Sequence, residues 1–236
     1  VSAASGAVGS VVGQIGKSSG YKNQIKVVNK HSADLTLEHD LPQKVDLIIS
    51  EILSAEFVGE GVRESIKDAR IRLLKREGRM IPESGEVRIA LLGKNKEISR
   101  LIQASESQGF DLSALNTIMQ SKFDYQFVEK PNMFSDPASA FALNLYDDDF
   151  SRDLNITIPL ETCKSGVCIG VIQWLKISVF DDIQYENFPG DNWSHWPTPV
   201  FLFDEPLNVK KGDTIKIDGF LGKDRLWFFN RKTHET

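Results

Sequence analysis

Residues 45–82 read VDLIISEILSAEFVGEGVRESIKDARIRLLKREGRMIP. The stretch opens on Val45–Ile49, an almost uninterrupted apolar run that predicts a buried parallel strand. Glu51 follows this run, and Glu60 lies further on between two glycines. Because ligands in an open α/β sheet bind beyond the carboxyl ends of its strands, we expect Glu51 to face a crevice. The glycines free the backbone on both sides of Glu60, so this second carboxylate is expected to turn toward the same place.

Two convergent carboxylates suit three chemical tasks. They can hold a divalent metal, share a proton as acid and base, or grip a guanidinium, whose donors match carboxylates bidentately. The nearest histidines, His31 and His39, do not stand at a ligand spacing, so no metal site is predicted. Alternatively, both acids are solvated, or Glu60 stabilises the amino end of the next helix. The spacing alone does not decide between these interpretations.

Residues 1–82 have the pattern of an α/β segment. Apolar residues recur at helical spacing over residues 62–75, which predicts an amphipathic helix ended by a glycine and a proline. Upstream, residues 3–16 predict a helix of small residues packed closely on a sheet, and residues 24–28 alternate as a strand does. Alternating strands and helices are typical of the α/β class.

Residues 83–236 predict an all-β domain. Short alternating runs separated by glycine and aspartate turns are typical of a sandwich or barrel. The runs span residues 86–91, 170–177, 200–203, 214–217 and 225–229. Residues 111–150 are less regular and predict a helical excursion, with helices over residues 113–119 and 132–141.

Composition narrows the class of protein. The chain has 236 residues, enough for one large domain or two small ones, and a net charge of -5, which argues against a nucleic-acid partner. The uncharged opening VSAASGAVGSVVGQIG is too short and too rich in glycine to span a membrane. The two cysteines, Cys163 and Cys168, are expected as reduced thiols. We therefore expect a protein of the cytoplasm, with the nucleus as a second location and no membrane partner.

Several motifs resemble the protein arginine N-methyltransferases. Residues 45–82 resemble that family's hairpin of two acids and the following helix, with Glu51 and Glu60 at the positions of the acids. Residues 192–196, NWSHW, are similar to its Thr-His-Trp loop, with Ser194 in place of the threonine. The glycine on each side of the second acid, and KVVNKHSADL upstream, look most like the divergent branch that contains the seventh and ninth human members.

The resemblance implies an architecture. Residues 1–82 would be the C-terminal part of a Rossmann-like methyltransferase domain that uses S-adenosylmethionine. Residues 83–236 would form a β-barrel domain with an inserted helical arm at about residues 111–150. In the family such an arm docks on a second copy or on an internal repeat, so a homodimer or an internal pseudo-dimer is implied. The implied substrates are proteins that contain arginine.

The resemblance also implies roles for single residues. Glu51 and Glu60 would be the catalytic clamp on the substrate guanidinium. Substrate contacts would come from His195, Trp196 and Glu56, the last favouring basic neighbours of the arginine. The loop that lines the adenine of the cofactor would consist of His31, Ser32, Ala33 and Asp34. Within it, Ala33 replaces an acid found in many relatives, and Asp34 is the nearest carboxylate.

Other interpretations remain open. The family's glycine-rich cofactor motif and its ribose-binding acid do not occur in the chain, and we expect them upstream of Val1. A catalytically inactive family member that acts as a binding or pseudo-dimer partner is the alternative. A third possibility is a β-sandwich that binds carbohydrate through Trp174, Trp193 and Trp196. The aromatic turn at residues 193–196 could equally pack two domains together.

Overall fold

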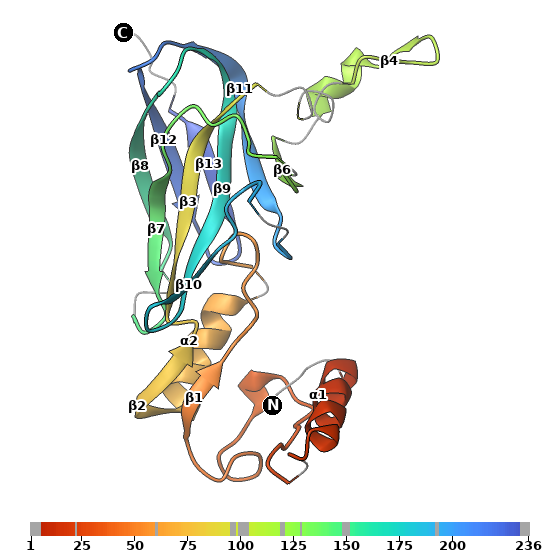
Figure 1. Ribbon diagram of the computed structural model, residues 1–236, viewed down its shortest axis with the longest axis vertical. Coiled ribbons are helices and arrows are strands. Elements are labelled where there is room, and N and C mark those ends of the chain that lie inside the picture. The colour runs from red at the N-terminus through yellow and green to blue at the C-terminus, as the bar shows by residue number, and fades with distance from the viewer. Residues whose placement is uncertain are drawn as a thin grey trace.

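The computed structural model has three parts, which Figure 1 shows from one side. A tall domain of two β-sheets stands above a small α/β segment that contains β1, α2 and β2. A short arm with β4 projects from the upper end of the two-sheet domain. The structure describes residues 6–21, 23–59, 61–94, 98, 104–118, 121–127, 129–147, 152–191 and 194–231.

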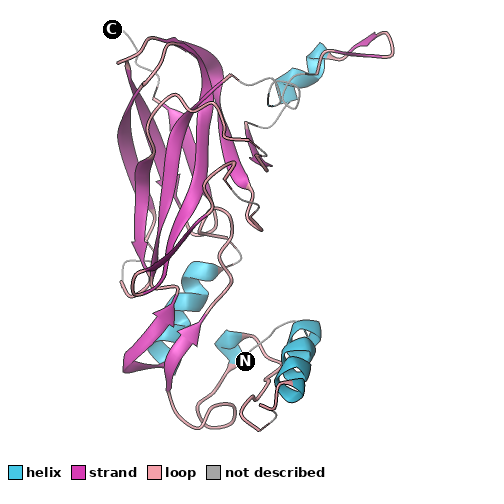
Figure 2. Ribbon diagram, viewed as in Figure 1, coloured by secondary structure: helices cyan, strands magenta, loops and turns pink. Residues whose placement is uncertain are grey.

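Strands dominate the chain (Figure 2). The helices are α1 (Gly6–Ser18), α2 (Val62–Leu73) and the 3-10 turns η1 (Ser32–Asp34) and η2 (Ser113–Ile118). The strands are β1 (Val45–Ile49), β2 (Leu74–Ile81), β3 (Ser84–Gly93), β4 (Glu106–Ser107), β5 (Phe110–Asp111), β6 (Lys122–Tyr125), β7 (Ala138–Asn144), β8 (Leu154–Glu161), β9 (Gly166–Phe180), β10 (Ile183–Glu186), β11 (Thr198–Val209), β12 (Thr214–Leu221) and β13 (Leu226–Asn230).

The helix predicted over residues 62–75 is confirmed as α2, but the chain after this helix differs from the prediction. It continues as β2, which pairs in parallel with β1 in a register that sets Leu47 opposite Arg79 and Ile49 opposite Ile81. Gly78 therefore lies inside a strand, where an added Cβ would come within 2.6 Å of the Leu74 side chain. The sequence hides this strand because LKREGRMI is charged and lacks apolar alternation.

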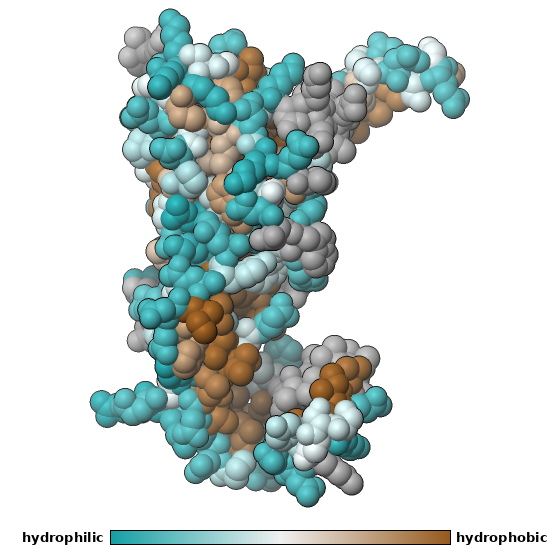
Figure 3. Space-filling model, in the orientation of Figure 1, coloured by the Kyte–Doolittle hydropathy of each residue, from teal (hydrophilic) through white to brown (hydrophobic). Residues whose placement is uncertain are grey.

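β1 is a parallel strand, as predicted, but it is not buried. Leu47 is 42% exposed and Ile49 is 70% exposed. Among the described residues the sheet of β1 has two strands, so β1 has a partner on one edge. Figure 3 shows the resulting apolar surface over β1 and the chain that follows it.

The first helix and the first predicted strand also differ from expectation. α1 overlaps the helix predicted over residues 3–16 and ends two residues later, but its Val11 and Ile15 side chains are exposed. Its glycines approach the side chains of Ile25 and Val27, so the described part of α1 packs against a segment that is not a strand. Within residues 24–28, Val28 makes an isolated bridge and no strand is assigned.

The two-sheet domain confirms the five strands predicted there. One sheet runs β6-β11-β9-β3-β7, with β10 on β9, and the other runs β13-β12-β8. β9 lies at the centre, and its near-continuous apolar sequence follows from burial on both faces. One face of its sheet packs into the main core through Leu175, and the other carries Trp174 in a second cluster.

The arm differs from the predicted range. The hairpin of β4 and β5 and the turn η2 project from the domain, so the extension lies within residues 94–121 (Figure 1). Residues 122–125 and 138–144 are β6 and β7 of the large sheet. The helix predicted over residues 132–141 is therefore wrong, since ASAFALN pairs with β3. No described helix is long and apolar enough to cross a membrane.

Candidate functional site

Glu51 lies two residues beyond the end of β1, and a crevice in front of it stays a prediction. The ladder between β1 and β2 finishes with a bond of 2.8 Å from the Ser50 amide to the carbonyl of Ile81. Glu51 is the next residue, and its side chain is exposed. Its carboxylate is thus held at the carboxyl edge of a parallel pair of strands and stays open to a ligand.

The loop after Glu51 is fixed to the two-sheet domain by Phe57. This residue is fully buried and adopts a left-handed backbone conformation, with φ of 67°, which is costly for a non-glycine residue. Its ring lies on the backbone of Gly85, where an added Cβ would be 2.2 Å from Phe57 Cε2. The fully buried Gln173 of β9 donates a bond of 3.0 Å to the carbonyl of Ala55. The loop is therefore held by β3 and β9.

The glycines around the second acid have the predicted backbone freedom. Gly59 has φ of 117° and Gly61 has φ of 70°, and Gly61 caps the amino end of α2. Glu60 lies outside the described residues, so its convergence with Glu51 stays a prediction. The backbone on each side of Glu60 does make the turn that the glycines predicted.

Arg63 in the first turn of α2 links this helix to the three-stranded sheet β13-β12-β8 of the two-sheet domain. Its side chain is 1% exposed, and Nη1 donates a bond of 2.7 Å to the carbonyl of Gly222. Nη2 bonds to the carbonyl of Arg152. Burial lowers the pKa of Arg63, and the charges of Asp153 and Asp224 oppose that shift. The helix that follows the second acid is thereby docked on the β-domain.

Glu56, predicted to contact basic residues of the substrate, already has partners within the chain. One carboxylate oxygen bonds to the ammonium of Lys122, and the other accepts a bond of 3.0 Å from the amide of Leu226. The Glu56 and Lys122 side chains are each about one-fifth exposed. These contacts join the loop to β6 and β13. A contact of Glu56 with substrate stays a prediction, and it would compete with Lys122.

The predicted aromatic loop is anchored on β9 and β10. The hydroxyl of Ser194 lies 2.8 Å from that of Tyr185 and accepts a bond of 3.1 Å from the amide of Trp196. The Trp196 ring meets Tyr185 edge-on, with centroids 5.8 Å apart. His195 between them is exposed, whereas Trp196 is half-buried against the main core. This turn therefore packs Trp196 against the main core and leaves His195 accessible.

β9 brings the two predicted substrate elements to the same end of the domain. Gln173 holds the loop after Glu51, and the amide of Leu175 donates a bond of 2.7 Å to Asn187, whose side chain also donates to the carbonyl of Trp196 at 3.5 Å. Residues two apart in a strand are separated by about 7 Å. The two loops therefore attach to neighbouring points of one strand.

The predicted adenine loop forms the turn η1, and Arg72 of α2 holds it. Arg72 donates to the carbonyls of Leu35 (2.7 Å), Ser32 (3.1 Å) and Ala33 (3.1 Å). Asp68, one helical turn earlier, accepts two bonds of 2.6 Å from the same guanidinium. The hydrogen bond to Asp68 raises the pKa of Arg72. The sequence analysis did not predict these bonds from Arg72 to the turn. The available signal was the spacing of four residues between Asp68 and Arg72, which places them side by side on a helix.

The turn presents its remaining polar groups to solvent. The His31 ring accepts a bond of 3.3 Å from the amide of Ala33, which caps the turn. Asp34 is exposed, so its carboxylate is open to a hydrogen-bond donor such as the amino group of a purine. A contact of this turn with the adenine of a cofactor stays a prediction.

The carbohydrate interpretation is wrong for Trp174. This side chain is fully buried, and its indole nitrogen donates a bond of 2.7 Å to Glu186. It cannot form part of a surface platform with Trp196, and Trp193 lies outside the described residues. A burial pattern was visible in the sequence, since Trp174 sits within the apolar run of β9.

Comparison with known proteins identifies the family. Residues 86–226 match the model of the arginine methyltransferase oligomerization subdomain, which covers more than half of the chain. The chain belongs to the arginine methyltransferase family. The curated relatives include an arginine N(omega)-methyltransferase from Streptomyces achromogenes subsp. streptozoticus, 28% identical over 84% of this chain and 55% of the relative. Human protein arginine N-methyltransferase 2 is 24% identical over 91% of this chain and 52% of the relative.

Other relatives carry different family numbers. Protein arginine N-methyltransferase 7 from Gallus gallus is 20% identical over 94% of this chain and 36% of its own length. Relatives numbered 2 and 7 both match, so assignment to the divergent branch stays a prediction. The chain spans about half the length of the first curated relatives it matches.

A solved structure confirms the fold of this arginine methyltransferase chain. The Trypanosoma brucei PRMT1 enzyme-prozyme heterotetrameric complex with AdoHcy matches with a TM-score of 0.79 at 16% identity. The match covers 98% of this chain and 77% of that chain. The α/β segment and the two-sheet domain are therefore arranged as in a known member of the family.

Proposed function

We propose that the protein carrying this chain transfers a methyl group from S-adenosylmethionine to a guanidine nitrogen of arginine in protein substrates. The observation that carries the proposal is Glu51, exposed at the carboxyl end of β1 on the loop that leads to Glu60. This loop belongs to a chain of the arginine methyltransferase family.

Glu51 and Glu60 act as the clamp on the substrate guanidinium. A guanidinium is a poor nucleophile because its lone pairs are delocalised and its pKa exceeds about 12. Two carboxylates bind it in one orientation, draw its positive charge toward the bonded nitrogens and leave the third nitrogen facing the methyl donor. The fixed loop around Phe57 supports this role, since a clamp works only when its geometry is held in advance.

The turn at residues 31–34 holds the adenine end of the methyl donor. The sulfonium of S-adenosylmethionine supplies an activated methyl group for in-line displacement. Asp34 would accept a hydrogen bond from the adenine amino group, and Ser32 would contact the ring through its backbone. Arg72 keeps the turn in place by occupying three of its carbonyls.

His195 and Trp196 close the arginine pocket beside the acids. The support for this role is their attachment to β9 next to the loop of Glu51. A half-buried indole offers its face to a guanidinium while the rest of the ring stays packed against the core.

The two sheets of the two-sheet domain form the two sides of the family's barrel. The projecting arm mediates contact between methyltransferase modules. Phe110, Leu115 and Ile118 expose apolar surface on the projecting arm. The matched family model is described as an oligomerization subdomain. A homodimer, or a pseudo-dimer within one polypeptide, would cover that surface.

The experiment measures transfer of radiolabelled methyl groups to an arginine-rich peptide by the full-length protein. Glu51→Gln and Glu60→Gln should each reduce kcat/KM by about 10²-fold or more, as removal of preorganised charge does elsewhere. Glu77→Gln, an exposed acid on β2, is the matched control and should leave the rate unchanged. Full activity in either clamp variant would refute the proposed role. Binding of S-adenosylhomocysteine without any transfer would indicate an inactive family member.

A further inference from the structure

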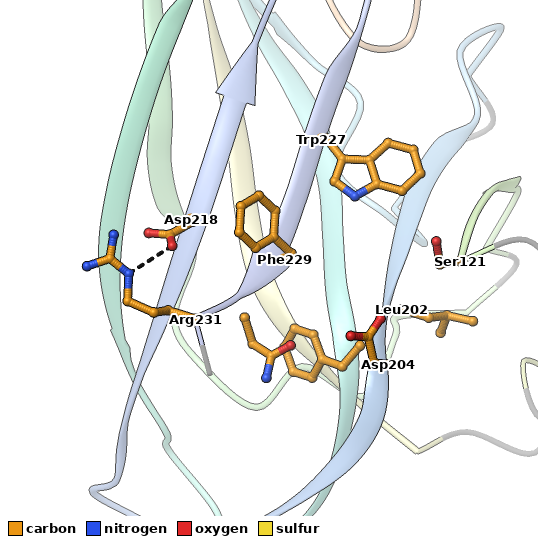
Figure 4. A pocket seen from close by; sticks show the side chains of 9 residues that line it. Ser121, Leu202, Asp204, Asp218, Trp227, Phe229 and Arg231 are labelled. Atoms are coloured by element: carbon orange, nitrogen blue, oxygen red, sulfur yellow. Dashed lines mark hydrogen bonds and ion pairs between the residues drawn. The ribbon is translucent and has the colours of Figure 1, made fainter. Parts of the chain in front are cut away.

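Two ion pairs that involve the two-sheet domain differ in what they connect. Figure 4 shows Arg231 bound to Asp218 beside a pocket; Asp218 lies on β12, and Arg231 directly follows β13, the neighbour of β12 in the same sheet. Arg79 instead lies on β2 of the α/β segment, and its guanidinium binds Asp181 in the turn between β9 and β10. The second pair therefore links the two parts of the molecule that carry the candidate site.

The Arg79 guanidinium contacts three groups at once. Its Nη2 donates a bond of 2.6 Å to the carboxylate of Asp181 and a second bond to that of Glu83. The guanidinium carbon lies 3.7 Å from the ring centroid of Phe180. The Arg79 side chain is 40% exposed, and a single ion pair at such a position adds little stability. Two carboxylates and a ring together restrict the cation to one position, as a single exposed pair does not.

The partners of Arg79 are themselves fixed to the two-sheet domain. The amide of Glu83 donates a bond of 2.9 Å to the carbonyl of Ser178 in β9. Phe180 is the last residue of β9, and Asp181 follows it with φ of 49°, a left-handed conformation that aspartate adopts more readily than most residues. Arg79 therefore reaches from the α/β segment to the turn of the β9-β10 hairpin.

On its own side, Arg79 belongs to the pair of strands that leads to Glu51. Its register partner in β1 is Leu47, and the ladder ends with the bond of 2.8 Å from the Ser50 amide to the carbonyl of Ile81. Glu51 is the next residue. Arg79 thus fixes the strands that precede Glu51.

On the other side, β10 continues from the turn to the aromatic loop. β10 begins two residues after Asp181 and pairs with β9. The Tyr185 ring of β10 meets the Trp196 ring edge-on, with centroids 5.8 Å apart. Asn187, directly after β10, donates to the carbonyl of Trp196 at 3.5 Å. The turn that Arg79 contacts is therefore the start of the segment that orients Trp196.

We propose that Arg79 is a positioning residue of the candidate site, which fixes the separation between the Glu51 carboxylate and the Trp196 ring by linking β2 to the β9-β10 hairpin. The assignment rests on the proposed methyltransferase function. Arg79 acts through these two elements and does not touch the substrate. Because a displacement of about 1 Å can slow a reaction about 10²-fold, loss of Arg79 lowers kcat more than it raises KM.

The test measures methyl transfer to an arginine-rich peptide by the full-length protein. Arg79→Ala should lower kcat about 10-fold and change KM less than about twofold. Asp181→Asn, which keeps a residue suited to the left-handed turn, should lower kcat about 3-fold. The double variant should be no slower than Arg79→Ala, since both changes remove the same contact. Arg79→Lys should recover part of the rate because it keeps the charge without the planar fork.

Two matched controls lie beside the altered residues. Arg76→Ala changes an exposed arginine of the same strand, and Asp182→Asn changes the exposed acid next to Asp181; both should leave kcat unchanged. The melting temperature of Arg79→Ala should stay within about 2 °C of that of the unaltered protein. An unchanged kcat in Arg79→Ala, or additive losses in the double variant, would overturn the inference. A fall in melting temperature that accompanies the loss of rate would overturn it as well, because the role of Arg79 would then be purely structural.

Amide hydrogen exchange separates this inference from the proposed function, because it needs no turnover. Peptides that contain Asn187 and Trp196 should take up deuterium about 3-fold faster or more in Arg79→Ala, and at the unaltered rate in Arg76→Ala. If the protein transfers no methyl group, the proposed function fails while the exchange rates still test the link between β2 and the hairpin. Unchanged exchange in Arg79→Ala would refute that link.

Discussion

The two-sheet domain and the α/β segment differ in how they bury their apolar residues. β9 has fully buried residues on both faces, with Leu175 in the main core and Trp174 in the second cluster. β1 instead exposes Leu47 and Ile49, although its sequence is as apolar as that of a core strand. An apolar sequence therefore predicts a strand in both regions but does not predict how completely that strand is covered.

The contrast indicates where the α/β segment obtains its stability. α2 is docked by Arg63, and the amide of Met80 in β2 donates a bond of 2.6 Å to the hydroxyl of Tyr146. Phe57 lies in the same core cluster as β3 and β9. The candidate site thus sits on a segment whose loop is held by the β-domain, and disruption of that attachment should cost more than changes on the open face.

The largest effect is expected from Phe57→Ala. Removing a fully buried ring leaves a cavity over Gly85, so the free energy of unfolding should fall by about 3–5 kcal/mol. Urea denaturation followed by circular dichroism measures the change. Ile183→Ala, at a position of β10 that is 62% exposed, is the control and should change stability by less than about 0.5 kcal/mol. Equal losses in the two variants would show that the loop is not anchored by its ring.

The sequence predicts elements well where a local period sets them. The alternation in β3, β9 and β12 and the helical spacing of α2 each match a strand or a helix in the structure. β2 and β7 escape detection because a charged stretch and a run of alanine and serine become strands through pairing with β1 and β3. Their partners are distant in sequence, so no local pattern reveals them.

The candidate site was predictable in part for the same reason. The position of Glu51 after a strand, and the turns at the two glycines, follow from local patterns. Gln173 and Arg72, which hold the two loops, act across long sequence separations and required the structure. Glu56 shows the opposite case, since a family pattern suggested substrate contact while tertiary packing supplies Lys122 and Leu226 as partners.

An intermediate effect is expected from Arg72→Ala in the full-length protein. Loss of three bonds to the carbonyls of η1 leaves this turn free to adopt other conformations, so its cofactor contacts must be ordered on binding. The dissociation constant for S-adenosylhomocysteine should rise about tenfold, or about 1.4 kcal/mol. Calorimetric titration measures it.

Two further variants give this prediction a control. Arg72→Lys keeps the charge but not the planar fork, and should recover only part of the affinity. Arg76→Ala removes a fully exposed arginine of β2 and should have no effect. If Arg72→Ala binds S-adenosylhomocysteine as tightly as the unaltered protein, the clamp on η1 does not serve the cofactor.

The smallest effect is expected on the open face of β1, where Ile49→Ser and Ile48→Ser form a matched pair. Ile49 is 70% exposed, so the serine should lower the free energy of unfolding of this chain by less than about 0.5 kcal/mol. Ile48, its neighbour, is half-buried against both the main core and the cluster of Leu35, Ala69 and Leu73, so its replacement should cost about 2 kcal/mol or more. Urea denaturation of both variants gives the difference. Similar losses would mean that β1 is covered on both faces in solution, as its sequence alone suggests, and the contrast with β9 would then disappear.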